Sequence, residues 1–126
     1  MIIAKFIKKD YTTIYAYEGT YKVKNSDSIS RGIVVLEDNE PIGILTIEDL
    51  AKKNYQIIID CLSKKPVVEQ TDKISDVLYL MESSGNNILM VYDNNLFVGT
   101  ISSNDILSHL HNSFKSQKKN YTIGCS

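Results

Sequence analysis

Hydrophobic and polar positions follow one order at residues 33–50 and repeat it at residues 88–106. In each block an apolar run precedes a short polar turn, and a second apolar run follows the turn. Apolar runs rich in β-branched and aromatic residues on either side of an Asp/Asn turn are typical of β-hairpins. We therefore predict two similar hairpins. Their runs and turns lie at 33–36, 38–39 and 42–45 in the first block, and at 88–92, 93–95 and 97–101 in the second.

The two blocks align without a gap, VLEDNEPIGILTIEDL at 35–50 with VYDNNLFVGTISSNDI at 91–106. A hydroxyl residue followed three positions later by an acidic residue is typical of a helix N-terminus, so we predict that a helix begins at each hydroxyl. A glycine inside a strand often marks close approach by a ligand or by another backbone. The matched residues, each pair 56 positions apart, are Gly43 and Gly99, Thr46 and Ser102, and Asp49 and Asp105.

Residues 72–84, between the two blocks, have the periodicity of an amphipathic helix. Gly85 is suited to ending that helix, and residues 66–68 before it form an extended segment. The second half is therefore predicted to run strand, helix, strand, strand, helix. The apolar residues of the helical face recur at i, i+3, i+4 and i+7, and they are Ile74, Val77, Leu78 and Met81.

The first half departs from this order. The segment 56 positions before the helix, residues 16–28, has no helical face. Residues 14–17 and 21–24 alternate in polarity around Glu18-Gly19-Thr20, which favours a β-hairpin there. Residues 25–31 are polar and are expected to form a loop.

Composition narrows the functional classes. The 126 residues are 43% hydrophobic and 23% charged, with a formal net charge of −1. This is ordinary for one globular module, and the near-neutral charge gives no general attraction to nucleic acid or anionic membranes. The apolar runs are far shorter than the roughly 20 residues of a membrane span, and the N-terminus does not resemble a signal peptide. Cys61 is expected in the core, Cys125 has no paired spacing, and a cytoplasmic location is expected.

The sequence contains no familiar catalytic or metal-binding motif. A P-loop, paired zinc-ligand spacing, a nucleophile elbow and an HExxH motif are all absent. His109 and His111 are two positions apart and would point to different helix faces, so they cannot share a metal. We expect neither an enzyme nor a resident cofactor or metal. A small enzyme or nucleic-acid binder with a coincidental repeat stays open as an alternative.

The repeated elements resemble a known family, the paired CBS motifs of a Bateman module. Each copy has an apolar strand, an Asp/Asn turn and a G-h-h-[TS]-x-x-D segment that leads into a helix; residues 66–110 resemble a complete motif and residues 32–53 the C-terminal half of another. The resemblance implies an α/β fold in which each motif is a small sheet packed against helices, with a β-hairpin replacing the first helix of the first motif. It implies a degenerate first motif at 1–60, a second motif at 61–113 and a linker-like tail at 114–126.

The same resemblance implies a regulatory ligand, an adenine nucleotide such as AMP, ADP or ATP, in a cleft between the motifs. Asp105 would accept hydrogen bonds from ribose hydroxyls, and Ser102 would contact a phosphate. An ionised carboxylate complements a diol, and the unsatisfied N–H groups of a helix N-terminus complement a phosphate. Gly99 would leave room for close backbone approach. The implied base-flanking residues are Val67, Val68, Ile88 and Leu89, and in the first copy only Thr46 and Asp49 match.

Simpler roles for the same residues stay open. Thr46 with Asp49, and Ser102 with Asp105, could act as helix caps alone. The module would then be a ligand-free dimerisation or scaffold module. In either case we expect a homodimer, because apolar helical faces left outside a small module tend to bind a copy of themselves. A sensing module would pass its signal to a partner protein or to an attached effector domain.

Overall fold

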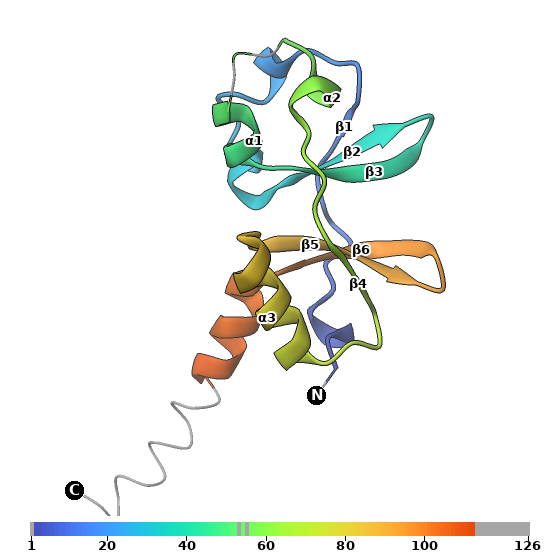
Figure 1. The fold of residues 1–126 in the computed structure, drawn as a ribbon, viewed down its shortest axis with the longest axis vertical. Coiled ribbons are helices and arrows are strands. Elements are labelled where there is room, and N and C mark those ends of the chain that lie inside the picture. The colour runs from blue at the N-terminus through green and yellow to red at the C-terminus, as the bar shows by residue number, and fades with distance from the viewer. Residues whose placement is uncertain (1, 53, 55, 113–126) are drawn as a thin grey trace, which may run out of the picture.

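Each half of the chain contains a three-stranded sheet in the computed structural model, which describes residues 2–52, 54 and 56–112 (Figure 1). In both sheets the first strand pairs parallel with the second, and the second pairs antiparallel with the third. This confirms a mixed α/β fold built from two similar units. The strands are β1 (Thr13–Tyr15), β2 (Ile33–Glu37) and β3 (Glu40–Leu45) in the first half, and β4 (Val67–Glu69), β5 (Ile88–Asp93) and β6 (Leu96–Ser102) in the second.

Both predicted hairpins form, and their turns have the same backbone conformation. Asp38 and Asn39 have φ of 52° and 64°, and Asn94 and Asn95 have φ of 49° and 69°. Two consecutive left-handed residues make the turn that best matches the twist of a hairpin, and Asn and Asp tolerate this conformation. Each hairpin also has a register shift at the same point of the repeat. The apolar runs and the turn residues between them were therefore enough to place both hairpins.

The predicted helix between the blocks is α3 (Ile74–Ser84), whose predicted face packs into the core. Gly85 ends it with φ of 71°, in the left-handed conformation that glycine adopts without strain. Two shorter helices, α1 (Ile47–Lys52) and α2 (Ile58–Cys61), belong to the first half, and residues 103–112 are helical after β6. Figure 1 shows α1 and α2 beside the first sheet, and α3 with the last helix beside the second.

The β-hairpin predicted at residues 14–24 is wrong. Only β1 forms there, and it is followed by two 3₁₀ helices, η2 (Thr20–Lys22) and η3 (Asp27–Arg31). The backbone around Gly19 pairs with residues 56–58 instead of with its own neighbours. Thr20 N donates to the Gln56 carbonyl at 2.8 Å, and Ile58 N donates to the Glu18 carbonyl at 3.0 Å. This non-local pairing occupies backbone N–H and C=O groups that a local hairpin would need.

The N-terminal segment crosses the predicted boundary between the motifs. Ile3, and Phe6 at the end of the 3₁₀ helix η1 (Ala4–Phe6), are buried in the core of the second half together with α3. Ile58 and Cys61 of α2 are buried in the core of the first half, which confirms Cys61 as a core residue and carries that core one residue past the boundary. The boundary at residues 60 and 61 stays a prediction about the repeat, and the hydrophobic cores cross it.

A third apolar cluster joins the two sheets. Val34, Ile44 and Met90 are buried between the halves, and Ile88 and Tyr92 pack against them. In Figure 1 the linker between α2 and β4 crosses at this level, as does the chain before β1. The two halves are therefore held by an apolar contact and by two crossing segments. The tail predicted at 114–126, with Cys125, lies outside the described residues.

Candidate functional site

A pocket with a volume of about 910 Å³ lies between the two halves. Its walls come from the segment before β1, from η3, from the start of β5, and from the end of β6 with the start of the helix 103–112. Four separate stretches of the chain therefore converge on one cavity. The residues that define it chemically are Lys8, Asp10, Tyr11, Thr12, Asp27, Arg31, Ile88, Thr100, Ser102, Asn104 and Asp105.

Ser102 and Asp105 lie on the wall of this pocket where the last helix begins. Ser102 Oγ accepts a hydrogen bond from Asp105 N at 3.3 Å, so the predicted helix cap is present. The Asp105 carboxylate is half-buried, and within the described part of the chain no hydrogen bond or ion pair engages it. Asp105 is therefore an acceptor on the pocket wall that no donor among the described residues engages.

Charged groups of both signs line the same pocket. Lys8 and Arg31 supply two cations, and Asp10, Asp27 and Asp105 supply three carboxylates. A guanidinium and an ammonium are the protein groups that best bind a phosphate, whereas a carboxylate accepts from hydroxyl donors. The pocket thus combines, in one cavity, the groups that suit the two polar parts of a nucleotide.

The apolar wall of the pocket is formed by Tyr11 and Ile88, both half-buried. The Tyr11 ring packs edge-on against Phe97, with centroids 5.2 Å apart and an interplanar angle of 68°. An edge-to-face contact of this kind holds a ring in a fixed orientation. The pocket therefore offers a flat or branched apolar surface beside its charged groups, as small-molecule sites usually do.

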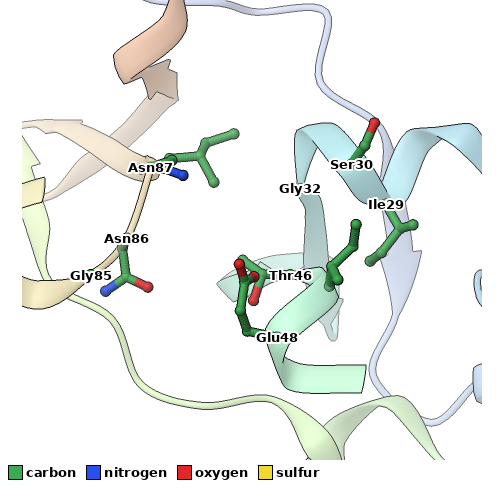
Figure 2. A pocket seen from close by; sticks show the side chains of 10 residues that line it. Ile29, Ser30, Gly32, Thr46, Glu48, Gly85, Asn86 and Asn87 are labelled. Carbon is green, nitrogen blue, oxygen red and sulfur yellow. The ribbon is translucent and has the colours of Figure 1, made fainter. Parts of the chain in front are cut away.

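A smaller pocket of about 90 Å³ adjoins the first and contains Thr46 (Figure 2). Figure 2 shows Thr46 and Glu48 at the start of α1 facing Asn86 and Asn87 of the other half. The two pockets share Ser30, Gly32, Asn87 and Ile88 on their walls. The repeat thus places one hydroxyl at each pocket, and the volumes differ about tenfold.

Asp49, the repeat partner of Asp105, is closed off from both pockets. Its side chain is 1% exposed, and it accepts hydrogen bonds from Lys65 Nζ at 2.6 Å and Ser63 Oγ at 2.5 Å. The predicted cap is also present, because Thr46 N donates to Asp49 and Asp49 N donates to Thr46 Oγ1. Burial alone would raise the pKa of this carboxyl, but the Lys65 and Ser63 hydrogen bonds and the Lys65 charge outweigh it and lower the pKa.

The structure brings only part of the predicted site together. Ser102, Asp105 and Ile88 line the large pocket, and Thr46 lines the small one. Val68 and Leu89 are buried in the core of the second half, so their side chains flank neither pocket. Val67 is 53% exposed, and it also lies outside both pockets.

Gly99 lines neither pocket, and its missing side chain lets the backbone of Lys8 approach β6 closely. Lys8 N donates to the Thr100 carbonyl at 2.8 Å, and Thr100 N donates back to the Lys8 carbonyl at 3.0 Å. A Cβ at Gly99 would clash with the Lys8 carbonyl oxygen, and the glycine has φ of 149°, which side chains rarely allow. The sequence left two readings of this glycine open, and the protein backbone accounts for it.

Tyr11 and Thr12, just before β1, line the pocket in place of the predicted Val67 and Val68. Both predicted walls came from the second motif. The N-terminal segment instead crosses to the second half and brings residues 8–12 to the pocket that contains Asp105.

The described residues contain neither a membrane-spanning helix nor a metal-binding cluster. No helix at residues 2–52 or 56–112 combines the length and apolar character that a bilayer span requires. No group of three or more His, Cys, Asp or Glu side chains in the same part of the chain is arranged to hold a metal ion.

Comparison with known proteins identifies the fold. The profile of the CBS domain family matches residues 58–112, while no curated protein matches the chain. A CBS-domain protein from Burkholderia ambifaria MC40-6 is 19% identical with a TM-score of 0.74, over 87% of this chain and 93% of that one. The CBS domain pair of protein MJ0100, in complex with 5′-methylthioadenosine and S-adenosyl-L-methionine, is 16% identical with a TM-score of 0.75, over 90% and 98%.

A third solved structure, the cytosolic domain of the Mg²⁺ channel MgtE in complex with ATP, is 18% identical with a TM-score of 0.64. The alignment covers 82% of this chain and 46% of that one. Identities at this level show a shared fold, and these three structures share it along most of the chain.

Proposed function

We propose that this protein is a regulatory module that binds an adenine nucleotide, because residues 58–112 match the CBS domain family and the chain has the fold of a CBS domain pair. The nucleotide, AMP, ADP or ATP, binds in the large pocket between the halves. The observation that carries this proposal is the Asp105 carboxylate, which faces a cavity of about 910 Å³ with no partner among the described residues. Two proteins of the same fold in complex with adenosine compounds support the choice of ligand class.

Each part of the nucleotide has a complementary group in the pocket. Asp105 accepts hydrogen bonds from the two ribose hydroxyls, because an ionised carboxylate has only acceptors. Ser102, the N–H groups at the start of the last helix and the Arg31 guanidinium bind the phosphate. The base lies against Tyr11 and Ile88, the apolar wall of the pocket.

Binding is linked to regulation through the position of the pocket. The walls include η3 of the first half and the β6–helix junction of the second, so a ligand contacts both halves at once. A ligand changes the arrangement of two units only as far as it binds one arrangement better than another. The resulting change is passed to a partner protein or to an attached domain. We propose a regulatory rather than a catalytic role, a homodimer and a cytoplasmic location.

A thermal-shift panel with AMP, ADP and ATP tests this function. At a nucleotide concentration 100-fold above its Kd, binding stabilises the native state by about 2.7 kcal/mol, which raises Tm by several degrees. Asp105→Asn should remove this shift. The matched control is Asp76→Asn, at an exposed aspartate on α3 outside the pocket, and it should keep the shift.

Two outcomes would contradict the proposal. If no nucleotide changes Tm at millimolar concentration, the ligand-free scaffold becomes the better account of this chain. If Asp105→Asn keeps the full shift, a nucleotide binds elsewhere.

A further inference from the structure

Lys65 contacts Asp49 in the way that an external ligand would have to. Its ammonium donates to Asp49 Oδ2 at 2.6 Å, and to the carbonyl and hydroxyl oxygens of Ser63 at 3.0 and 3.1 Å. The Lys65 side chain is 7% exposed and that of Asp49 is 1% exposed. An ammonium has three donors, and all three are used here. The contact is therefore complete from the side of the lysine.

The Asp49 carboxylate is saturated as well. Oδ1 accepts from Ser63 Oγ at 2.5 Å and lies 3.7 Å from Lys52 Nζ, while Oδ2 accepts from Lys65 and from Thr46 N. A ribose diol would need the same lone pairs. Displacing Lys65 would also leave a buried ammonium without its counter-charge, which is strongly unfavourable. A ligand cannot reach this carboxylate while Lys65 stays in place.

The second copy of the motif has no such occupant among the described residues. Thr13 pairs with β2 as Val67 pairs with the repeated position of β5, so the counterparts of Ser63 and Lys65 are Lys9 and Tyr11. Lys9 is exposed, and Tyr11 is half-buried on the wall of the large pocket with its ring against Phe97. Asp105 consequently stays on the wall of the large pocket. The difference between the two sites arises from two side chains on the crossing segments, not from the motif.

We propose that Lys65 is an internal occupant that closes the Asp49 position, so that each chain binds a single nucleotide, at Asp105. The single-nucleotide part rests on the function proposed above, and the closure does not. Lys65 lies in the linker between α2 and β4, so its contact with Asp49 also fixes that linker against α1. The first half therefore keeps one arrangement, and the response to a nucleotide originates at the second.

Amine acetylation tests the closure without any nucleotide. In the folded parent chain, N-hydroxysuccinimidyl acetate should modify Lys65 at least about tenfold more slowly than its exposed neighbour Lys64, because reaction requires local opening of a buried pair. Tandem mass spectrometry measures both rates in one sample. In Asp49→Asn the protection of Lys65 should fall, while the rate at the exposed Lys9 should not change. Equal rates at Lys64 and Lys65 in the parent would overturn the closure.

Isothermal titration with AMP, ADP and ATP tests the stoichiometry. The parent should bind a single nucleotide per chain, Asp105→Asn should bind none, and Asp49→Asn should keep the parental stoichiometry. Two nucleotides per chain, one of them lost in Asp49→Asn, would overturn the inference and leave nucleotide binding intact. Absence of all binding would instead contradict the proposed function, and the acetylation rates would then decide the closure alone.

Discussion

The two halves of this chain carry the same G-h-h-[TS]-x-x-D pattern and use its aspartate in opposite ways. Asp49 is buried, and its carboxylate accepts hydrogen bonds from Lys65, Ser63 and the backbone N–H of Thr46. Asp105 keeps the same helix-start position and faces a large pocket instead. The motif therefore fixes where a carboxylate lies in the fold. Whether the carboxylate is available is decided by side chains from a distant segment.

The largest effect that sharpens this comparison is expected from Lys65→Met. Removing one partner of a buried ion pair leaves the other charged and unpaired, so this variant should lose about 3–5 kcal/mol of the free energy of unfolding. Urea denaturation measures the loss. Lys64→Met, at an exposed neighbour that forms no ion pair with any residue at 2–52, 54 or 56–112, should change the stability by less than about 0.5 kcal/mol.

The double variant Asp49→Asn/Lys65→Met isolates the charge. It removes both members of the pair, so it should recover a large part of the loss seen in Lys65→Met. Equal stabilities of Lys65→Met and Lys64→Met would show that Lys65 is not paired as described, and the contrast between Asp49 and Asp105 would disappear.

Local signals in the sequence predicted the parts of the fold that local interactions stabilise. The left-handed Asp/Asn turns, the face of α3 with its Gly85 stop, and both helix caps all depend on residues within a few positions of one another. The same local signals gave a wrong hairpin around Gly19, because the backbone there pairs with residues 56–58. Alternating polarity cannot reveal a partner 38 residues away.

The candidate site was predictable only in the part that the repeat contains. Ser102 and Asp105 follow from the motif, and Ile88 follows from the strand before it. Tyr11 was missed, because the passage of the N-terminal segment into the second half is a long-range packing event that no local pattern encodes. The Lys65–Asp49 pair was missed for the same reason, since the two residues meet only when the linker folds back on α1.

A second contrast concerns the two strand glycines, and Gly99→Ala should be the more damaging substitution. Gly99 has φ of 149°, and a Cβ there would meet the backbone of Lys8, which cannot move without breaking two hydrogen bonds to Thr100. Overpacking of this kind typically destabilises by about 1–3 kcal/mol. The midpoint of urea denaturation reports the difference.

Gly43→Ala is the matched control at the related position. A Cβ at Gly43 would lie 3.1 Å from Cδ2 of the half-buried Leu62, a flexible side-chain end that can shift slightly. The loss should therefore be under about 1 kcal/mol. A larger loss in Gly43→Ala than in Gly99→Ala would contradict the account of Gly99 as the point where a backbone crosses the sheet.

The packing of the N-terminal segment and of α2 predicts matched effects of Ile3→Val and Ile58→Val. Ile3 is fully buried in the core of the second half, across the predicted motif boundary, and Ile58 is fully buried in the core of the first half, so each variant should lose about 0.5–1.5 kcal/mol. Ile2→Val, at a residue 48% exposed, is the control and should change the stability very little. Chemical denaturation followed by circular dichroism measures all three. If Ile3→Val behaved like Ile2→Val, the N-terminal segment would not belong to the core of the second half.

The smallest expected effect that distinguishes the two aspartates is the pH dependence of stability in acid. Because the pKa of Asp49 is lowered in the native state, the unfolded chain takes up a proton first as the pH falls. The pair therefore stabilises the protein fully above the ordinary aspartate pKa of about 3.9, and its contribution is lost as the pH falls from there through the lowered pKa of Asp49. For one proton, the free energy of unfolding falls by at most about 1.4 kcal/mol per pH unit.

Urea midpoints between neutral pH and pH 3 should thus fall more steeply for the parent than for Asp49→Asn/Lys65→Met, since all other carboxylates are common to both. A constant offset between the two chains across this range would mean that Asp49 does not titrate with folding, and that Lys65 does not hold it charged.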